Sequence, residues 1–374
     1  MPTLIDKSLF DYAIHEQIST HRYANQQVQD IVGLLNEADR ELLAKIHGID
    51  DINKLLYYID HTVKVRGKET VIRNYYLREE LKAIVDAAYW QAETDLHKEM
   101  GGFALHVADS TEGMLATQLP IAFKTVSVSP DQLKAILSND PIKIGKDGAD
   151  LFSDIFAKLA GNKVDDIRKA IRLGMVQGET TDQITRRLKG TRAAQYRDGI
   201  LEGSRRDMAN LVRTTTNFVG NQSALMTFQA NSEVVSGWVD VASLDGKTCN
   251  YCWSRSGRVY SLNEDGPPWH VSCRCFKVPR VRTWKELGFD NMPEYPVGQR
   301  ASSSGPVPAD ISFESWVRTQ NKSAQVELLG PTRQKLFAAG GLKLDKFTDN
   351  SGQLYTLADL KGKHAKAFKK AFGG

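Results

Sequence analysis

Residues 245–275 read DGKTCNYCWSRSGRVYSLNEDGPPWHVSCRC and contain all four cysteines of the 374-residue chain. A secreted protein stabilised by disulfides spreads its bridges across the fold, whereas these cysteines lie within one window, Cys249–Cys275. A local cluster of this kind is typical of a single site, most often a metal site, in a protein that folds in a reducing cytosol. We therefore expect a metal centre in this segment.

The spacing of the donor residues matches a tetrahedral zinc site. Cys249 and Cys252 form a C-x2-C pair, which directs two thiolates toward one cation. His270 and Cys273 form an H-x2-C pair, and Cys275 follows two residues later. Zinc needs four donors and the segment offers five, so we expect Cys249, Cys252 and His270 with one of Cys273 and Cys275. Four protein ligands close a site, which predicts a structural zinc ion rather than a catalytic one.

The same residues allow two other interpretations. The cysteines can form a reduced or disulfide-bonded knot that packs the loop without metal. One of them can be a catalytic thiol, although no obvious set of nucleophile, base and orienting group surrounds His270 in the sequence. If Cys273–Cys275 is extended, both thiols lie on one face of a strand, and the second can pack nearby rather than bind metal.

The segments around the cluster predict an α+β protein that is mainly α-helical, with a small β-containing Cys/His metal-loop subdomain. Apolar residues at helical spacing predict a long helix over roughly 205–230, just before the cluster. Alternating residues then predict a strand over 235–241. Residues 274–281 predict a returning strand that is broken by Pro279.

Composition along the chain divides it into four parts. Residues 1–148 form an N-terminal helical region, in which the segment near 100–128 predicts short strands or extended arms. Residues 149–289 hold further capped helices and the cysteine cluster. Residues 290–310 are rich in Pro, Gly and Ser and predict a linker. Residues 311–374 predict a helical C-terminal extension with a basic tail.

The overall composition excludes several classes of protein. The net charge of +4 is too small to indicate a nucleic-acid-binding protein by itself. No run approaches 18 apolar residues, so we expect no membrane span, and the first residues lack the pattern of a signal peptide. The sequence has no Walker A motif, no G-x-S-x-G, no H-E-x-x-H and no dinucleotide-binding glycine fingerprint.

Basic residues gather between residues 186 and 213. The candidates for contact with DNA or a partner protein are Arg186, Arg187, Arg192, Arg205 and Arg206. The plain alternative is a solvated helical face. Contacts from such residues to phosphates would depend on salt but not on base sequence.

Two features beside the cluster carry smaller expectations. Arg274 alternates away from both neighbouring thiols, and we consider an ion pair with Asp240 or Asp245. Three tryptophans flank the cluster: Trp238, Trp253 and Trp269. We expect them to pack around the loop, with stacking on nucleic-acid bases as the alternative.

Several short runs between about residues 150 and 282 occur in a characteristic order. A run of the form R-x-x-M-x-N-L-V-R-T begins at Arg205, at the start of the long helix. The Cys/His segment then supplies Asp245, Cys249, Cys252, Gly257–Tyr260, Pro268, His270, Cys273, Arg274 and Cys275. This combination resembles the phage head morphogenesis family, the Mu F-like minor head proteins of tailed bacteriophages. The run from Trp316 to Gly340 looks like the C-terminal extension that such proteins often carry.

The resemblance implies a structural virion protein rather than an enzyme. Such a protein is present in few copies, associates with the phage portal protein or the major capsid protein, and acts in head assembly, DNA packaging or genome ejection. It implies packaged double-stranded DNA as a further partner and the virion head as the location. Assembly in the host bacterial cytoplasm would explain reduced thiols.

Two other function classes fit part of the pattern. A zinc-stapled phage nuclease of HNH-like type also has paired cysteines around a histidine. That class needs a further catalytic His or Asn, but His270 would be used as a zinc ligand, and the next histidine is His364. A zinc-ribbon nucleic-acid-binding protein would have a second C-x2-C in place of H-x2-C-x-C, and a more basic domain.

Overall fold

The computed structural model describes residues 7–48, 61–65, 68–72, 75–118, 123–143, 148–242, 244, 248–291, 299–300, 302–305, 307–308, 311–348 and 354–373. The chain divides into two compact units, which we describe separately. Unit 1 consists of Met1–His21, Ala104–Leu133 and Asn217–Gly374. Unit 2 consists of Arg22–Phe103 and Lys134–Thr216.

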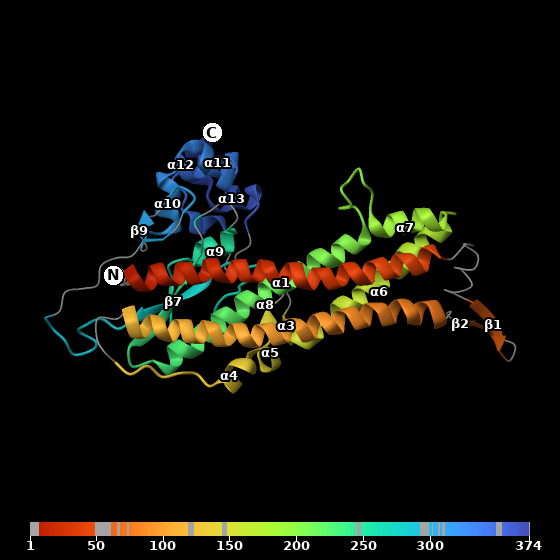
Figure 1. Cartoon of the computed structure of the whole chain (residues 1–374). Helices are drawn as coiled ribbons and strands as arrows, with labels where there is room; N and C mark the ends of the chain where they lie inside the picture. Colours follow the sequence, from red (N-terminus) through yellow and green to blue (C-terminus); the bar gives the residue numbers. More distant parts are fainter. Residues whose placement is uncertain are drawn as a thin grey trace. The chain divides into compact units, whose positions relative to one another are not determined.

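Four long helices supply most of the secondary structure, and Figure 1 shows each of them as an unbroken ribbon. They are α1 (Lys7–His47), α3 (Tyr75–Gln118), α6 (Phe152–Val176) and α8 (Ile200–Ala230). The predicted long helix over 205–230 is therefore confirmed, and it begins five residues earlier than expected. Its apolar residues, like those of α6, recur at helical spacing and are buried along one side.

The extended structure expected near residues 100–128 is wrong over its first part. Residues 100–118 continue α3. The buried residues recur every three to four positions, as in a helix, and are Met100, Phe103, Ala104, Val107, Ala108, Thr111, Met114 and Leu115. The glycines Gly101 and Gly102 lie inside the helix, and burial of this face outweighs their cost of about 1 kcal/mol each. Residues 123–129 are neither helix nor strand.

Unit 2 contains a buried ion cluster. The Lys163 ammonium lies 2.6 Å from Asp39 Oδ1, and both side chains are almost fully buried. Arg205 donates to the other carboxylate oxygen at 2.8 Å. Lys163 also lies over the ring of Tyr89, 5.7 Å from its centroid. These contacts join residues of α1, α3, α6 and α8 at a single point.

The rest of unit 2 consists of short elements. They are β1 (His61–Val65), β2 (Lys68–Ile72), α5 (Ile136–Asn139), β3 (Ile142–Lys143), β4 (Ala149–Asp150) and α7 (Thr181–Lys189). The strands pair as two antiparallel hairpins, β1 with β2 and β3 with β4. Helix α7 begins with the predicted capping box, in which Thr180 and Gln183 satisfy each other's backbone amides.

Unit 1 contains a three-stranded antiparallel sheet in the order β6–β5–β7. The strands are β5 (Val235–Val241), β6 (Val259–Tyr260) and β7 (Phe276–Val281). Both predicted strands are thus confirmed, but β7 is not broken at Pro279, which pairs with Trp238. Because β7 is an edge strand, a residue without an N–H group can be accommodated there. Gly237 is required in β5, since an added Cβ would lie 2.4 Å from the carbonyl oxygen of Tyr260.

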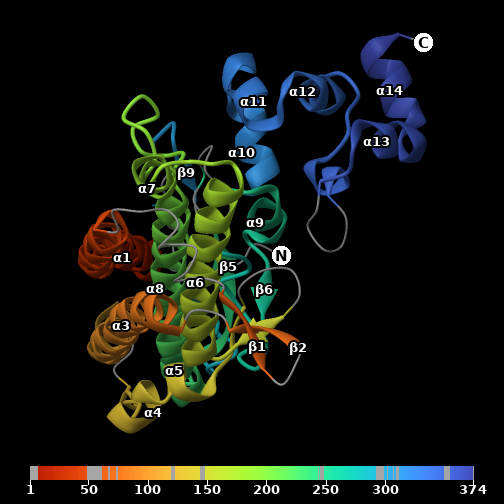
Figure 2. The same cartoon turned by 90° about the vertical axis from the view of Figure 1, so that its right-hand side faces the viewer.

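Short helices complete unit 1. They are α4 (Pro130–Lys134), α9 (Asn250–Arg255), α10 (Phe313–Thr319), α11 (Lys322–Leu329), α12 (Pro331–Ala338), η1 (Leu344–Phe347), α13 (Leu357–Lys363) and α14 (Ala365–Phe372). Figure 2 shows α10 to α14 gathered at the C-terminal end of the chain. Their core, built on Trp316, Leu336 and Phe337, also includes Trp253 of α9. The small pairs β8 (Gln299–Arg300) and β9 (Val307–Pro308) precede them.

The predicted fold class is confirmed, because the described residues are mainly helical with a small sheet beside the Cys/His cluster. Within those residues, no helix is both long enough and apolar enough to cross a membrane. The boundaries that we predict at 148/149, 289/290 and 310/311 stay predictions. Much of the predicted linker over 290–310 lies outside the described residues.

Candidate metal centre

The cysteines and His270 come together beside the sheet of unit 1. Cys249 directly precedes α9 and Cys252 lies within it, whereas Cys273 and Cys275 come just before β7. His270 Nε2 lies 3.0 Å from the sulfur of Cys249 and 3.1 Å from that of Cys252. The sulfurs of Cys252 and Cys273 are 3.8 Å apart. All five predicted donors are therefore in one cluster.

The donor set fits a zinc ion. Zn–S bonds of about 2.3 Å in a tetrahedral site place two sulfurs about 3.8 Å apart, the separation found between Cys252 and Cys273. A sulfur and an imidazole nitrogen would lie about 3.6 Å apart around the same ion. His270 must therefore withdraw by about half an ångström from its sulfur contacts to admit it. Thiolates and imidazole are the ligands that zinc prefers in structural sites.

Two overlapping groups of three donors share Cys252. One group is Cys249, Cys252 and His270, and the other is Cys252, Cys273 and Cys275. The charge on Cys273 helps to raise the pKa of His270, but Cys275 makes no such contribution. Cys275 instead interacts with the buried Asp240. Cys273 is thus better placed than Cys275 to complete a set with Cys249, Cys252 and His270.

The electrostatics of the cluster favour thiolates. The hydrogen bond from Cys252, together with His270, lowers the pKa of Cys249 to about 4. Hydrogen bonding to the Cys249 sulfur raises the pKa of His270 to about 9, against the opposing effect of burial. Hydrogen bonds from Cys252 also lower the pKa of Cys273. A site that already stabilises sulfur anions is suited to a cation, because metal binding requires deprotonated cysteines.

The ring of His270 is oriented for ligation through Nε2. Its Nδ1 lies 2.8 Å from the carbonyl oxygen of Val271. A proton on Nδ1 would be donated to this carbonyl, which leaves the Nε2 lone pair facing the sulfurs. The arrangement is the usual one for a metal-bound histidine, whose second nitrogen is held by a hydrogen bond.

Polar side chains from distant segments hold the loop that carries Cys273 and Cys275. Asn217 and Asn221 of α8 both donate to the carbonyl oxygen of Cys275, at 3.1 and 3.2 Å. Gln17 of α1 donates to the carbonyl oxygen of Arg274 at 3.0 Å. These amides fix the backbone around the two cysteines.

The three tryptophans beside the cluster pack, as expected. Trp238 stacks on Tyr260 with ring centroids 4.3 Å apart, and Trp253 stacks on Phe313 at the same distance. Trp269 donates from Nε1 to Asp240 at 2.8 Å. Burial raises the pKa of Asp240 to about 7.

Arg274 donates to the Thr248 hydroxyl at 3.4 Å. The Asp240 carboxylate, which we considered as its partner, accepts the Trp269 indole N–H. Asp245 lies outside the described residues. The contact to Thr248 therefore ties the cysteine pair of the β7 loop to the segment that precedes α9.

The five arginines singled out in the sequence belong to unit 2 and have two different environments. Arg187 pairs with Glu179, and Arg205 pairs with Asp39 and Glu202, so both are engaged within the chain. Arg186, Arg192 and Arg206 are exposed. Contact with DNA or a partner stays a prediction, and it now depends mainly on the exposed three.

The segment that holds these features has a counterpart among known families. Residues 165–278 match the model of the family described as Phage Mu protein F like protein. This confirms the resemblance seen in the sequence, over a shorter span than the expected 150–282. The Mu F-like segment contains most of α8, the three-stranded sheet, all five candidate metal ligands and all five arginines. Comparison with curated proteins and with solved structures found no match.

Proposed function

We propose that this chain is a minor head protein of a tailed bacteriophage, which binds the portal protein, the major capsid protein or both. The observation that carries the proposal is the match of residues 165–278 to the Mu F-like family, which points to a phage head protein. The choice of partners, and a role in head assembly, DNA packaging or genome ejection, are our own inference. The virion head, assembled in the host cytoplasm, is the proposed location.

We propose a structural zinc ion bound by Cys249, Cys252, His270 and Cys273. The separation of the sulfurs and the orientation of His270 support it. The ion would join α9 to the loop before β7 and so stabilise a segment with little core of its own. The candidate ligand groups found among the described residues contain only cysteine and histidine, without a carboxylate. This composition favours a closed structural site over a nuclease centre.

Co-expression with the portal and major capsid proteins of the same phage tests the proposed role. We expect the chain to co-purify with portal complexes or assembled heads and to be present in purified virions. A tagged chain with the metal centre intact provides the reference, and a phage tail protein provides the negative control. Heads that form and package DNA normally without this chain, and virions that lack it, would contradict the proposal.

DNA binding is expected to depend on the exposed arginines of unit 2. Replacing Arg186, Arg192 and Arg206 with Gln should weaken binding to a mixed-sequence duplex at low salt. The slope of log K against log salt should become shallower by up to about 0.9 for each phosphate that is no longer neutralised. A matched control replaces three exposed lysines elsewhere, Lys124, Lys343 and Lys346. Equal weakening in both triple variants, or no binding at low salt, would remove DNA from the set of partners.

A further inference from the structure

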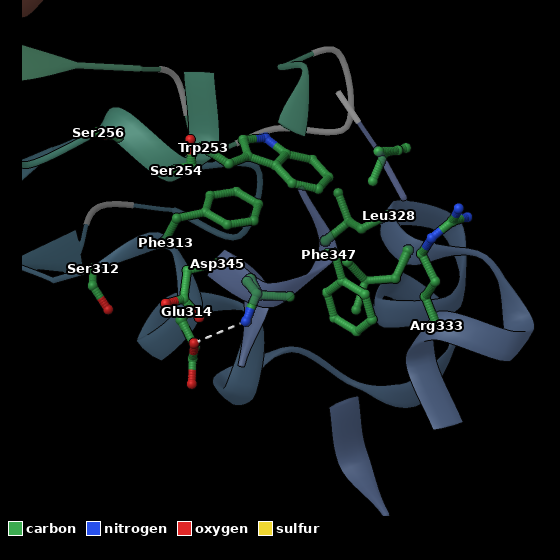
Figure 3. A pocket seen from close by; sticks show the side chains of 13 residues that line it. Trp253, Ser254, Ser256, Ser312, Phe313, Glu314, Leu328, Arg333, Asp345 and Phe347 are labelled. Carbon is green, nitrogen blue, oxygen red and sulfur yellow. Dashed lines mark hydrogen bonds between the residues drawn. The ribbon is translucent and has the colours of Figure 1, made fainter. Parts of the chain in front are cut away.

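A cavity of about 190 Å³ lies in unit 1 between α9 and the C-terminal helices. Figure 3 shows its side chains, with Trp253 and Phe313 on one side and Leu328, Phe347 and Arg333 on the other. The stacked pair Trp253–Phe313 forms a flat apolar wall. The walls come from α9, α10, α11, α12 and η1, so the cavity is a product of the tertiary fold rather than of one loop.

Two of the groups that line this cavity are hydrogen-bond donors without a partner. The Nε1–H of Trp253 and the Nε–H of Arg333 are buried and make no hydrogen bond to the described residues. The Trp253 side chain as a whole is 8% exposed. The guanidinium of Arg333 is held in place by its other end, which donates from Nη2 to the carbonyl oxygen of Tyr355 at 3.0 Å. Buried donors are normally paired, so an occupant that supplies acceptors is favoured.

The charges around the cavity exclude an anionic occupant. Two carboxylates, Glu314 and Asp345, line it together with the guanidinium of Arg333. The Glu314 oxygens already accept from Arg318 and from the backbone amide of Leu344, at 2.7 and 3.1 Å. A phosphate or a free carboxylate would be repelled by this surplus of negative charge. A neutral carbonyl oxygen would not be.

The size of the cavity points to one side chain. Pockets for small organic ligands usually measure about 300–1,000 Å³, well above the volume found here. We propose that the cavity is a docking site for a neutral peptide segment of a partner protein. The segment inserts one aliphatic or aromatic side chain between Trp253 and Leu328, and its main-chain carbonyls accept from the two unpaired donors. This interaction surface does not depend on the proposed virion role.

NMR spectroscopy of the full-length 15N-labelled chain tests the proposal, with N-acetyl-leucinamide and N-acetyl-phenylalaninamide as probes. Trp253→Phe identifies the indole N–H signal of Trp253 among the six tryptophans. We expect a saturable downfield shift of that signal, because the indole N–H gains an acceptor. Arg333→Lys keeps the charge but lacks the Nε–H, and we expect it to weaken binding by about tenfold.

Cavity-filling variants separate docking from non-specific contact. Leu328→Phe and Leu328→Trp should abolish the shift, whereas Leu173→Trp, at an exposed position of α6, should leave it unchanged. The dispersion of the other indole signals shows whether each variant is folded. The absence of a saturable shift in the folded wild-type chain would overturn the proposal. So would an equal shift with acetate or benzene, or a shift that appears on raising the protein concentration without probe, which indicates self-association.

Discussion

Protein purified without chelator should contain one zinc ion per chain, and Cys252→Ser should lose it. Cys252 belongs to both groups of donors in the cluster, so its replacement leaves neither group of three complete. Structural zinc supplies about 10–16 kcal/mol in small zinc-finger peptides, which is as large as the whole stability of a typical domain. We therefore expect the segment between β5 and β7 to lose its order. Elemental analysis and amide hydrogen exchange measure the two effects.

Cys275→Ser is the matched control for this experiment. Cys275 is buried like Cys252 and undergoes the same chemical change, but it lies outside the proposed ligand set. The variant should keep its zinc ion, whereas Cys273→Ser should lose it. The opposite result for these two variants would exchange the fourth ligand. Wild-type protein without zinc would refute the metal centre and favour a metal-free thiol cluster.

The second large effect is expected at the buried ion cluster of unit 2, in Asp39→Asn. The amide would leave the Lys163 ammonium, which is almost fully buried, without an anion. Breaking a buried ion pair by removing one partner costs about 3–5 kcal/mol. The midpoint of urea denaturation should fall accordingly. The control is Asp165→Asn, at an exposed pair with Arg168, where we expect a change below about 1 kcal/mol. Equal changes in the two variants would contradict the prediction.

The same cluster makes stability depend on pH in a defined direction. Burial lowers the pKa of Lys163 from its usual 10.5, and the attraction of Asp39 opposes this effect only in part. Between the lowered pKa and 10.5, the unfolded chain holds a proton that the folded chain has released. The free energy of unfolding should therefore rise with pH across this interval. In Asp39→Asn the pKa falls further, so the rise should begin at lower pH.

Local sequence patterns predicted the elements that depend on nearby residues. Thr180 and Gln183 indicate the start of α7, because a capping box is formed within four residues. The C-x2-C and H-x2-C pairs likewise identify Cys249, Cys252, His270 and Cys273, since each pair is brought together by short-range geometry. The long helix and both strands around the cluster follow from simple periodicity.

The features that the sequence did not reveal depend on distant partners. Asn217, Asn221 and Gln17 are ordinary polar residues on helices, and no local pattern distinguishes them from solvent-exposed ones. Arg205 resembles a surface arginine in the sequence because its partner Asp39 is 166 positions away. The two adjacent glycines in α3 favour a turn locally, whereas tertiary burial of one face of α3 overrides this weak preference.

The hydrogen bond from Gln17 to the Arg274 carbonyl spans 257 positions of the chain. A ribosome adds roughly 5–20 residues per second, so on the order of 13–50 s separate the synthesis of its two ends. The first helix is therefore made well before the backbone that it holds, and its buried amide stays in water during that time. Closure of the cysteine loop against α1 is thus a late event in biosynthesis. It comes after most of the chain has left the ribosome, when zinc can be captured from the cytoplasm.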